Sequence, residues 1–83
     1  MKILVTDDSK MARKMVIKTL TDLLQDSVEI HEAQNGLEAL ELYKEILPKI
    51  TFLDLTMPVM DGFEALEKIK EFDIDAKVVI IFS

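Results

Sequence analysis

The sequence predicts an α/β fold built on a parallel sheet, and three observations support this. Short apolar runs typical of strands alternate with longer stretches in which apolar residues recur at helical spacing. The run at residues 77–82, KVVIIF, is apolar throughout, as expected of a parallel strand buried on both faces. Aspartates stand at the carboxyl ends of two other runs, the edge where open parallel sheets bind ligands. The expected order is therefore strand-helix-strand-helix-strand-helix-strand.

Composition limits the classes of protein that this chain can belong to. Of its 83 residues 49% are hydrophobic, so we expect a single small folded domain spanning residues 1–83. Without cysteine the chain has no disulfide framework and no thiolate metal site. A net charge of −6 and the lack of a long apolar segment argue against nucleic-acid or membrane binding. We expect a cytoplasmic protein.

The N-terminal part of the chain is predicted to form a strand, a helix and a second strand. The first strand covers residues 3–6, and Asp8 or Ser9 can cap the following helix, which should end at residue 25 or 26. Residues 28–33 alternate apolar and polar, which is typical of a half-covered edge strand. The solvent side of the helix is expected to carry four basic residues, Lys10, Arg13, Lys14 and Lys18.

Two further helices follow clear turn signals. Asn35-Gly36 ends the second strand, and the next helix should stop at Pro48, which a helix cannot easily continue past. The stretch ITFLDLTMPVMDG at residues 50–62 begins as a buried strand and ends in turn chemistry, after which the third helix begins. The apolar residues expected to mark the buried side of these two helices are Leu37, Leu40, Tyr43, Leu47, Phe63, Leu66, Ile69 and Phe72.

Asp54 is the odd residue within an apolar strand, and it suggests the layout of the sheet. If Asp54 meets the acidic pair Asp7 and Asp8, the first and third strands are neighbours. Right-handed crossovers then give strand order 2-1-3-4, with helices on both faces. Three convergent carboxylates repel one another unless a cation neutralises them, and all-oxygen ligation suits Mg²⁺. Each acid also has a purely structural alternative, as a cap of the helix or turn that follows it.

The segments VTDDS, FLDLTMPVMDG and VVIIFS resemble, in the same order, those of the receiver domain of two-component response regulators. The resemblance implies a flavodoxin-like fold that is incomplete here, because the family has a further helix, a fifth strand ending in a lysine, and a final helix. None of these has a counterpart in the 83 residues. The chain is thus expected to be a receiver domain truncated after the fourth strand.

The resemblance also implies roles for individual residues. Asp54 would accept a phosphoryl group from a sensor histidine kinase or a phosphotransfer protein, and Ser83 would supply the hydroxyl that senses it. The Mg²⁺ ligands would be Asp7, Asp8, Asp54 and the backbone carbonyl of Thr56. The rim of the site would be formed by Met57, Pro58, Asp61 and Gly62. The lysine that pairs with the phosphoryl group in this family has no counterpart.

Three functions remain open from the sequence. The first is a phosphoacceptor signalling domain, which is not an enzyme, and the second is an inactive half-domain that mainly self-associates. The third is a Mg²⁺-dependent phosphohydrolase, ranked last because it would need a second acid two residues after Asp54, where Thr56 stands. A hydrophobic fourth strand at the sheet edge invites pairing with another chain. We therefore also expect a homodimer formed through that strand or through the first helix.

Overall fold

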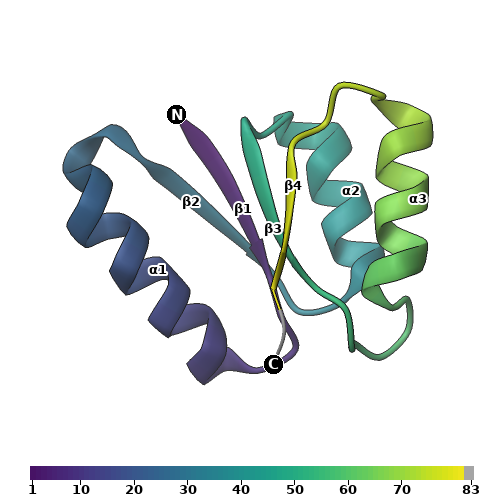
Figure 1. Cartoon of the computed structure of the whole chain (residues 1–83), viewed down its shortest axis with the longest axis horizontal. Helices are drawn as coiled ribbons and strands as arrows, with labels where there is room; N and C mark the ends of the chain where they lie inside the picture. The colour runs from purple at the N-terminus through teal and green to yellow at the C-terminus, as the bar shows by residue number, and fades with distance from the viewer. Residues whose placement is uncertain (82–83) are drawn as a thin grey trace.

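The computed structural model describes residues 1–81, apart from the side chain of residue 26. Within this part of the chain four strands form one parallel sheet, flanked by three α-helices (Figure 1). In chain order the elements are β1 (Lys2–Thr6), α1 (Lys10–Leu24), the short 3₁₀ helix η1 (Gln25–Ser27), β2 (Glu29–Ala33), α2 (Gly36–Ile46), β3 (Ile50–Asp54), α3 (Gly62–Phe72) and β4 (Val78–Ile81). Residue 82, predicted to belong to the last strand, lies outside the described residues.

The strand order is β2-β1-β3-β4, which confirms the predicted sheet. Helix α1 lies on one face, and α2 and α3 lie on the other (Figure 1). At the carboxyl end of β1, Thr6 pairs with Ala33 of β2 and with Leu53 of β3. Asp7 and Asp54 each come one residue after this row of paired residues. The register therefore brings the two acids to the same edge of the sheet.

The core lies between the sheet and the layer formed by α2 and α3. Leu4 and Leu53 are fully buried in the sheet, and the residues packed on them from the helices are Ala39, Tyr43, Ala65 and Ile69. The prediction that Leu37, Leu47, Phe63 and Phe72 face the core is wrong, since these side chains are 41%, 62%, 65% and 49% exposed.

Two glycines explain the orientation of these helices. A Cβ atom on Gly36 would collide with the carbonyl of Met60, and one on Gly62 would collide with the carbonyl of Asp54. Both helices therefore begin with a glycine whose backbone directly contacts a loop or a strand. The residues three positions further on, Ala39 and Ala65, share the inward face. Leu37 and Phe63, which directly follow these glycines, are consequently turned partly toward solvent.

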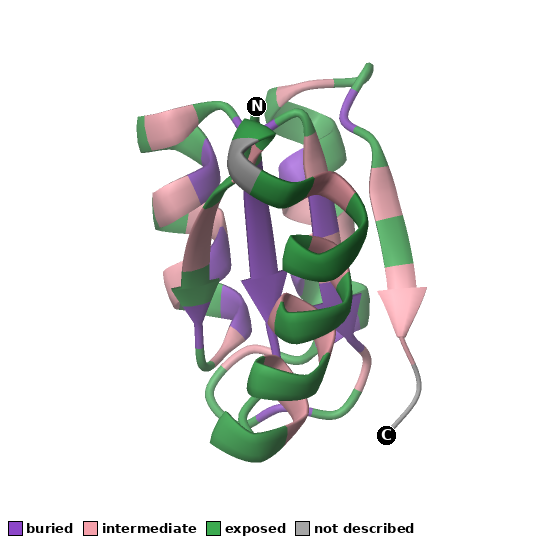
Figure 2. Cartoon of the chain, turned by 90° about the vertical axis from the view of Figure 1, so that its left-hand side faces the viewer, coloured by how far each residue is buried: buried purple, intermediate pink, exposed green. Residues whose placement is uncertain are grey.

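The opposite face of the sheet is covered less completely. None of the 15 residues of α1, all of them described, is buried, and the apolar residues Met15 and Leu23 are 67% and 73% exposed. Strand β4 lies beside α1 and not beneath it (Figure 2). The prediction that β4 is buried on both faces is also wrong, since Val79 is 44% exposed. The exposure of β4 is therefore decided by its position at the edge of the sheet and not by its apolar sequence.

In residues 1–81 no helix has the length and apolar character needed to cross a membrane.

Candidate functional site

The loop after β1 holds Asp7 through both its backbone and its side chain. The Asp7 amide donates to the carbonyl of Ala33 over 3.1 Å, which extends the ladder with β2 by one residue. The Asp7 Oδ1 atom accepts from the amide of Ser9 at 2.9 Å, and Ser9 Oγ in turn accepts from Ala12 N at 3.2 Å. Ser9 is therefore the N-cap of α1, one of the two residues predicted for that role.

Asp54 is the last residue of β3, and its side chain is only 1% exposed. Its Oδ1 atom accepts a hydrogen bond from the Thr56 amide at 3.4 Å. Carboxylate oxygens of Asp7, Asp8 and Asp54 all lie within 4.8 Å of one another. Asp7 is 2% exposed, whereas Asp8 lies on the surface. Two buried acids and one exposed acid thus form an acid cluster at the carboxyl edge of the sheet.

The electrostatics of the acid cluster favour a cation. Burial raises the pKa of Asp7 above its ordinary value. The Ser9 amide opposes this rise, and the negative charges of Asp54 and Asp8 add to it. A divalent cation would remove the repulsion among the three acids. The donors are all carboxylate oxygens, which is the ligand type that Mg²⁺ prefers, so the residues present fit this ion.

The β3–α3 loop carries the residues predicted to form the rim. Thr56 and Pro58 are exposed, whereas Met57 is 8% exposed and belongs to the hydrophobic core. Asp61 caps α3 by accepting from the amide of Glu64 at 2.9 Å.

The same loop is closed by a backbone hydrogen bond of Gly62, which is in the predicted rim, and it contains Val59, which is not. The Gly62 amide donates to the carbonyl of Leu55 over 3.0 Å. Val59 has φ 68°, in the left-handed region that a β-branched residue rarely adopts.

Ser83, the predicted switch hydroxyl, lies outside the described residues.

The sequence placed Arg13 on the solvent side of the first helix and did not identify its partners. Its side chain is only 12% exposed. Its Nη1 atom donates to the carbonyl of Asp7 at 2.7 Å, and its Nε atom donates to Glu32 Oε1 at 2.9 Å. The sequence did contain one indication of this contact: Arg13 lies one helical turn after Ser9, which places it beside the acid cluster.

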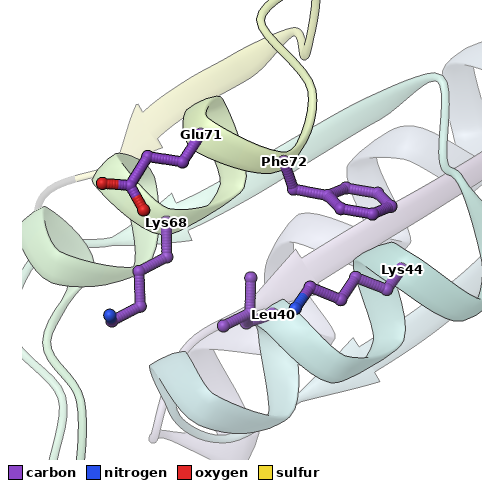
Figure 3. Close-up of a pocket in the computed structure, with 5 residues that line it drawn as sticks. All are labelled: Leu40, Lys44, Lys68, Glu71 and Phe72. Carbon is purple, nitrogen blue, oxygen red and sulfur yellow. The ribbon is translucent and has the colours of Figure 1, made fainter.

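A separate hollow of about 350 Å³ lies between α2 and α3 (Figure 3). Its lining residues are Leu40, Lys44, Lys68, Glu71 and Phe72. The Lys44 Nζ atom lies 5.5 Å from the centroid of the Phe72 ring, a cation–π contact. This hollow includes none of the three clustered acids, so it is distinct from the candidate site.

Comparison with known families agrees with this geometry. The sequence matches the response regulator receiver domain over residues 3–83. The chain belongs to this family. The resemblance seen in the sequence is thereby confirmed, and the sheet order and helices are those of a receiver domain.

Among similar proteins are the chemotaxis proteins CheY of Halobacterium salinarum and Listeria monocytogenes. The first is 41% identical over 83 residues, which is 99% of this chain and 66% of that protein. The second is 44% identical over 80 residues, covering 96% of this chain and 66% of the relative. The receiver domain described here thus spans slightly less than two thirds of the length of these relatives.

Solved structures show the same fold. One is a CheX–CheY–BeF₃–Mg²⁺ complex from Borrelia burgdorferi, in which the matched chain is 36% identical with a TM-score of 0.89. That match covers 98% of this chain and 60% of the other. Another is the receiver domain of the response regulator NarL from Mycobacterium tuberculosis, 34% identical with a TM-score of 0.85, covering 98% and 64% of the two chains.

Proposed function

We propose that this receiver domain takes a phosphoryl group on Asp54 while Asp7, Asp8 and Asp54 hold Mg²⁺. The observation that carries this proposal is the meeting of three carboxylates within 4.8 Å at the end of the central strands. An Asp54 oxygen would attack the phosphorus of a phosphohistidine, and the bond between phosphorus and the histidine nitrogen would break. The product is an aspartyl phosphate, and the donor is a sensor histidine kinase or a phosphotransfer protein.

Each residue of the site has a physical task in this reaction. The Ser9 and Thr56 amides orient the Asp7 and Asp54 carboxylates by hydrogen bonding. The backbone carbonyl of Thr56 would be a further oxygen ligand for the ion. Bound Mg²⁺ supplies positive charge that neutralises the acids and the incoming phosphoryl oxygens. Asp54 is 1% exposed, so the packing around it restricts the orientation of its carboxylate.

The structural neighbour from Borrelia burgdorferi supports the proposal, because its complex contains CheY with BeF₃ and Mg²⁺. We place the present chain among signalling domains and not among enzymes, since phosphorylation adds charge to a site that other segments or partners can read. A cytoplasmic location, away from membranes and nucleic acids, goes with this role.

The test is a titration with Mg²⁺ and then beryllofluoride, followed by amide NMR shifts. Saturable shifts at Asp7, Asp8 and Asp54 are expected, with the beryllofluoride shifts absent in Asp54→Asn. If Mg²⁺ binds a folded protein and beryllofluoride produces no shift, the phosphoacceptor function is refuted and the inactive half-domain is favoured. Turnover of a phosphomonoester with Mg²⁺ would instead favour the phosphohydrolase.

Self-association is a second candidate property, and one surface favours it. An apolar hollow of about 270 Å³ opens beside β4, lined by Met15, Val16, Thr19, Leu20, Phe52 and Ile81. Apolar hollows next to a sheet edge attract a second chain. Sedimentation at micromolar concentration should show a homodimer, and Met15→Glu should shift it toward monomer. A wild-type monomer over the whole concentration range would contradict the proposal.

A further inference from the structure

We propose, on the basis of the function proposed above, that Arg13 is a positioning residue that holds the backbone of Asp7 for metal binding. The hydrogen bonds that hold Arg13 reach the backbone of Asp7 and the side chain of Glu32. Its Nη1 atom donates to the Asp7 carbonyl at 2.7 Å, and its Nε atom donates to Glu32 at 2.9 Å. The guanidinium thus bridges the acidic loop and strand β2.

The bridge completes the attachment of Asp7 to the end of β2. On one side, the Asp7 amide donates to Ala33 at 3.1 Å. On the other side, the Asp7 carbonyl is bound by Arg13, which is anchored on Glu32, the neighbour of Ala33 in β2. Both backbone polar groups of the acid are therefore tied to adjacent residues of one strand. This fixes the direction in which the Asp7 side chain leaves the chain.

Arginine suits this position because its planar group carries several donors in fixed directions. One donor reaches a carbonyl and another reaches a carboxylate, and the side chain is 12% exposed. A lysine would keep the charge, but its single ammonium cannot reproduce the planar bridge. The acid cluster brings three carboxylates within 4.8 Å of one another, and like charges repel, so its loop needs support from outside the cluster.

A positioning role and a purely electrostatic role predict opposite changes in Mg²⁺ affinity. If only charge mattered, Arg13→Met would remove a positive charge near a cation site and tighten Mg²⁺ binding, while Arg13→Lys would change nothing. If Arg13 positions Asp7, both variants weaken Mg²⁺ binding by about tenfold or more, the range found for residues that orient metal ligands.

Glu32→Gln is the matched control, because glutamine keeps an oxygen acceptor for Arg13 Nε and removes only the charge. Its Mg²⁺ dissociation constant should stay within about twofold of wild type, since the bridge remains. Calorimetry or amide NMR shifts give the Mg²⁺ dissociation constant of each variant. Circular dichroism checks that each variant is folded. If Arg13→Met fails to fold, Arg13→Lys decides the question.

Hydrogen exchange of the metal-free protein gives a readout independent of the ion. In Arg13→Met the Asp7 amide should exchange at least tenfold faster, while amides of β3 keep their wild-type rates. Equal acceleration of both would show a general loss of stability and overturn the positioning role, as would tighter Mg²⁺ binding. Failure of wild type to bind Mg²⁺ would instead refute the proposed function, and the exchange rates would still decide the role of Arg13.

Discussion

The amide of Gly36 donates a hydrogen bond to the carbonyl oxygen of Met60, with an N–O distance of 2.8 Å. This bond joins the first residue of α2 to the loop that follows Asp54. The contact is so close that a side chain on Gly36 would collide with the Met60 carbonyl. The β3–α3 loop is therefore supported by a helix whose position depends on a glycine.

The variant Gly36→Ala should lower the free energy of unfolding by about 1–3 kcal/mol, because the added methyl group forces the loop or the helix to move. Urea unfolding measures the loss, and amide shifts in residues 56–61 would report the displaced loop. Glu41→Ala, on the exposed side of the same helix, is the control and should change stability by less than about 0.5 kcal/mol. Equal stability of the two variants would contradict the close contact.

Val59 should be replaceable with a gain in stability, because its φ of 68° is unfavourable for a β-branched residue. Asparagine tolerates this region, so Val59→Asn is expected to raise the free energy of unfolding by about 1 kcal/mol. The control is Ile74→Asn, at a residue that is 81% exposed and is not among those with positive φ. A similar gain in both variants would assign the effect to the removal of exposed apolar surface.

Asp7→Asn should stabilise the metal-free protein and abolish its stabilisation by Mg²⁺. Removing one charge from the acid cluster relieves repulsion of at least about 1 kcal/mol at neutral pH. The pKa of Asp7 is raised in the folded state, so wild-type stability is lost as pH rises above the ordinary value of 3.8. The difference in free energy of unfolding between variant and wild type should therefore widen toward pH 7 in chelator. A constant difference would refute this assignment.

Tyr43 allows a direct optical test, since it is the only tyrosine and the chain has no tryptophan. Burial and the hydrogen bond to Asp73 Oδ2, at 2.7 Å, raise its pKa to about 12. Absorbance of the phenolate should therefore titrate near this value, and stability should be lost as pH rises between 10 and 12. Tyr43→Phe should lose about 1 kcal/mol of stability and this part of the pH dependence. Titration near 10 in the folded protein would contradict the buried hydroxyl.

Several features of the fold could be predicted from the sequence because local chemistry and chirality leave little choice. Apolar runs alternating with helical periodicity imply a parallel sheet, and right-handed crossovers leave few strand orders. The order 2-1-3-4 follows once the acids at the ends of the first and third runs are assumed to meet at one edge. The structure confirms that assumption, since carboxylate oxygens of Asp7, Asp8 and Asp54 lie within 4.8 Å of one another.

Other features depended on contacts between distant segments. The sequence of β4 predicts burial on both faces, but burial requires a neighbour on each face. Strand β4 lies beside α1 and not beneath it, and Val79 is 44% exposed. Arg13 looked like an ordinary surface residue, because its partners Asp7 and Glu32 reach it only after β1 and β2 have paired.

The sequence alone determined which residues of α2 and α3 share a helical face, whereas only the tertiary structure decided which face points inward. Helical spacing allows a stripe through Leu37, Tyr43 and Leu47 as readily as one through Gly36, Ala39 and Tyr43. The close approach of the Gly36 and Gly62 backbones selects the second kind of stripe, since any side chain there would collide with a carbonyl. Periodicity is a property of the local chain, but inward orientation depends on the space left by packed neighbours.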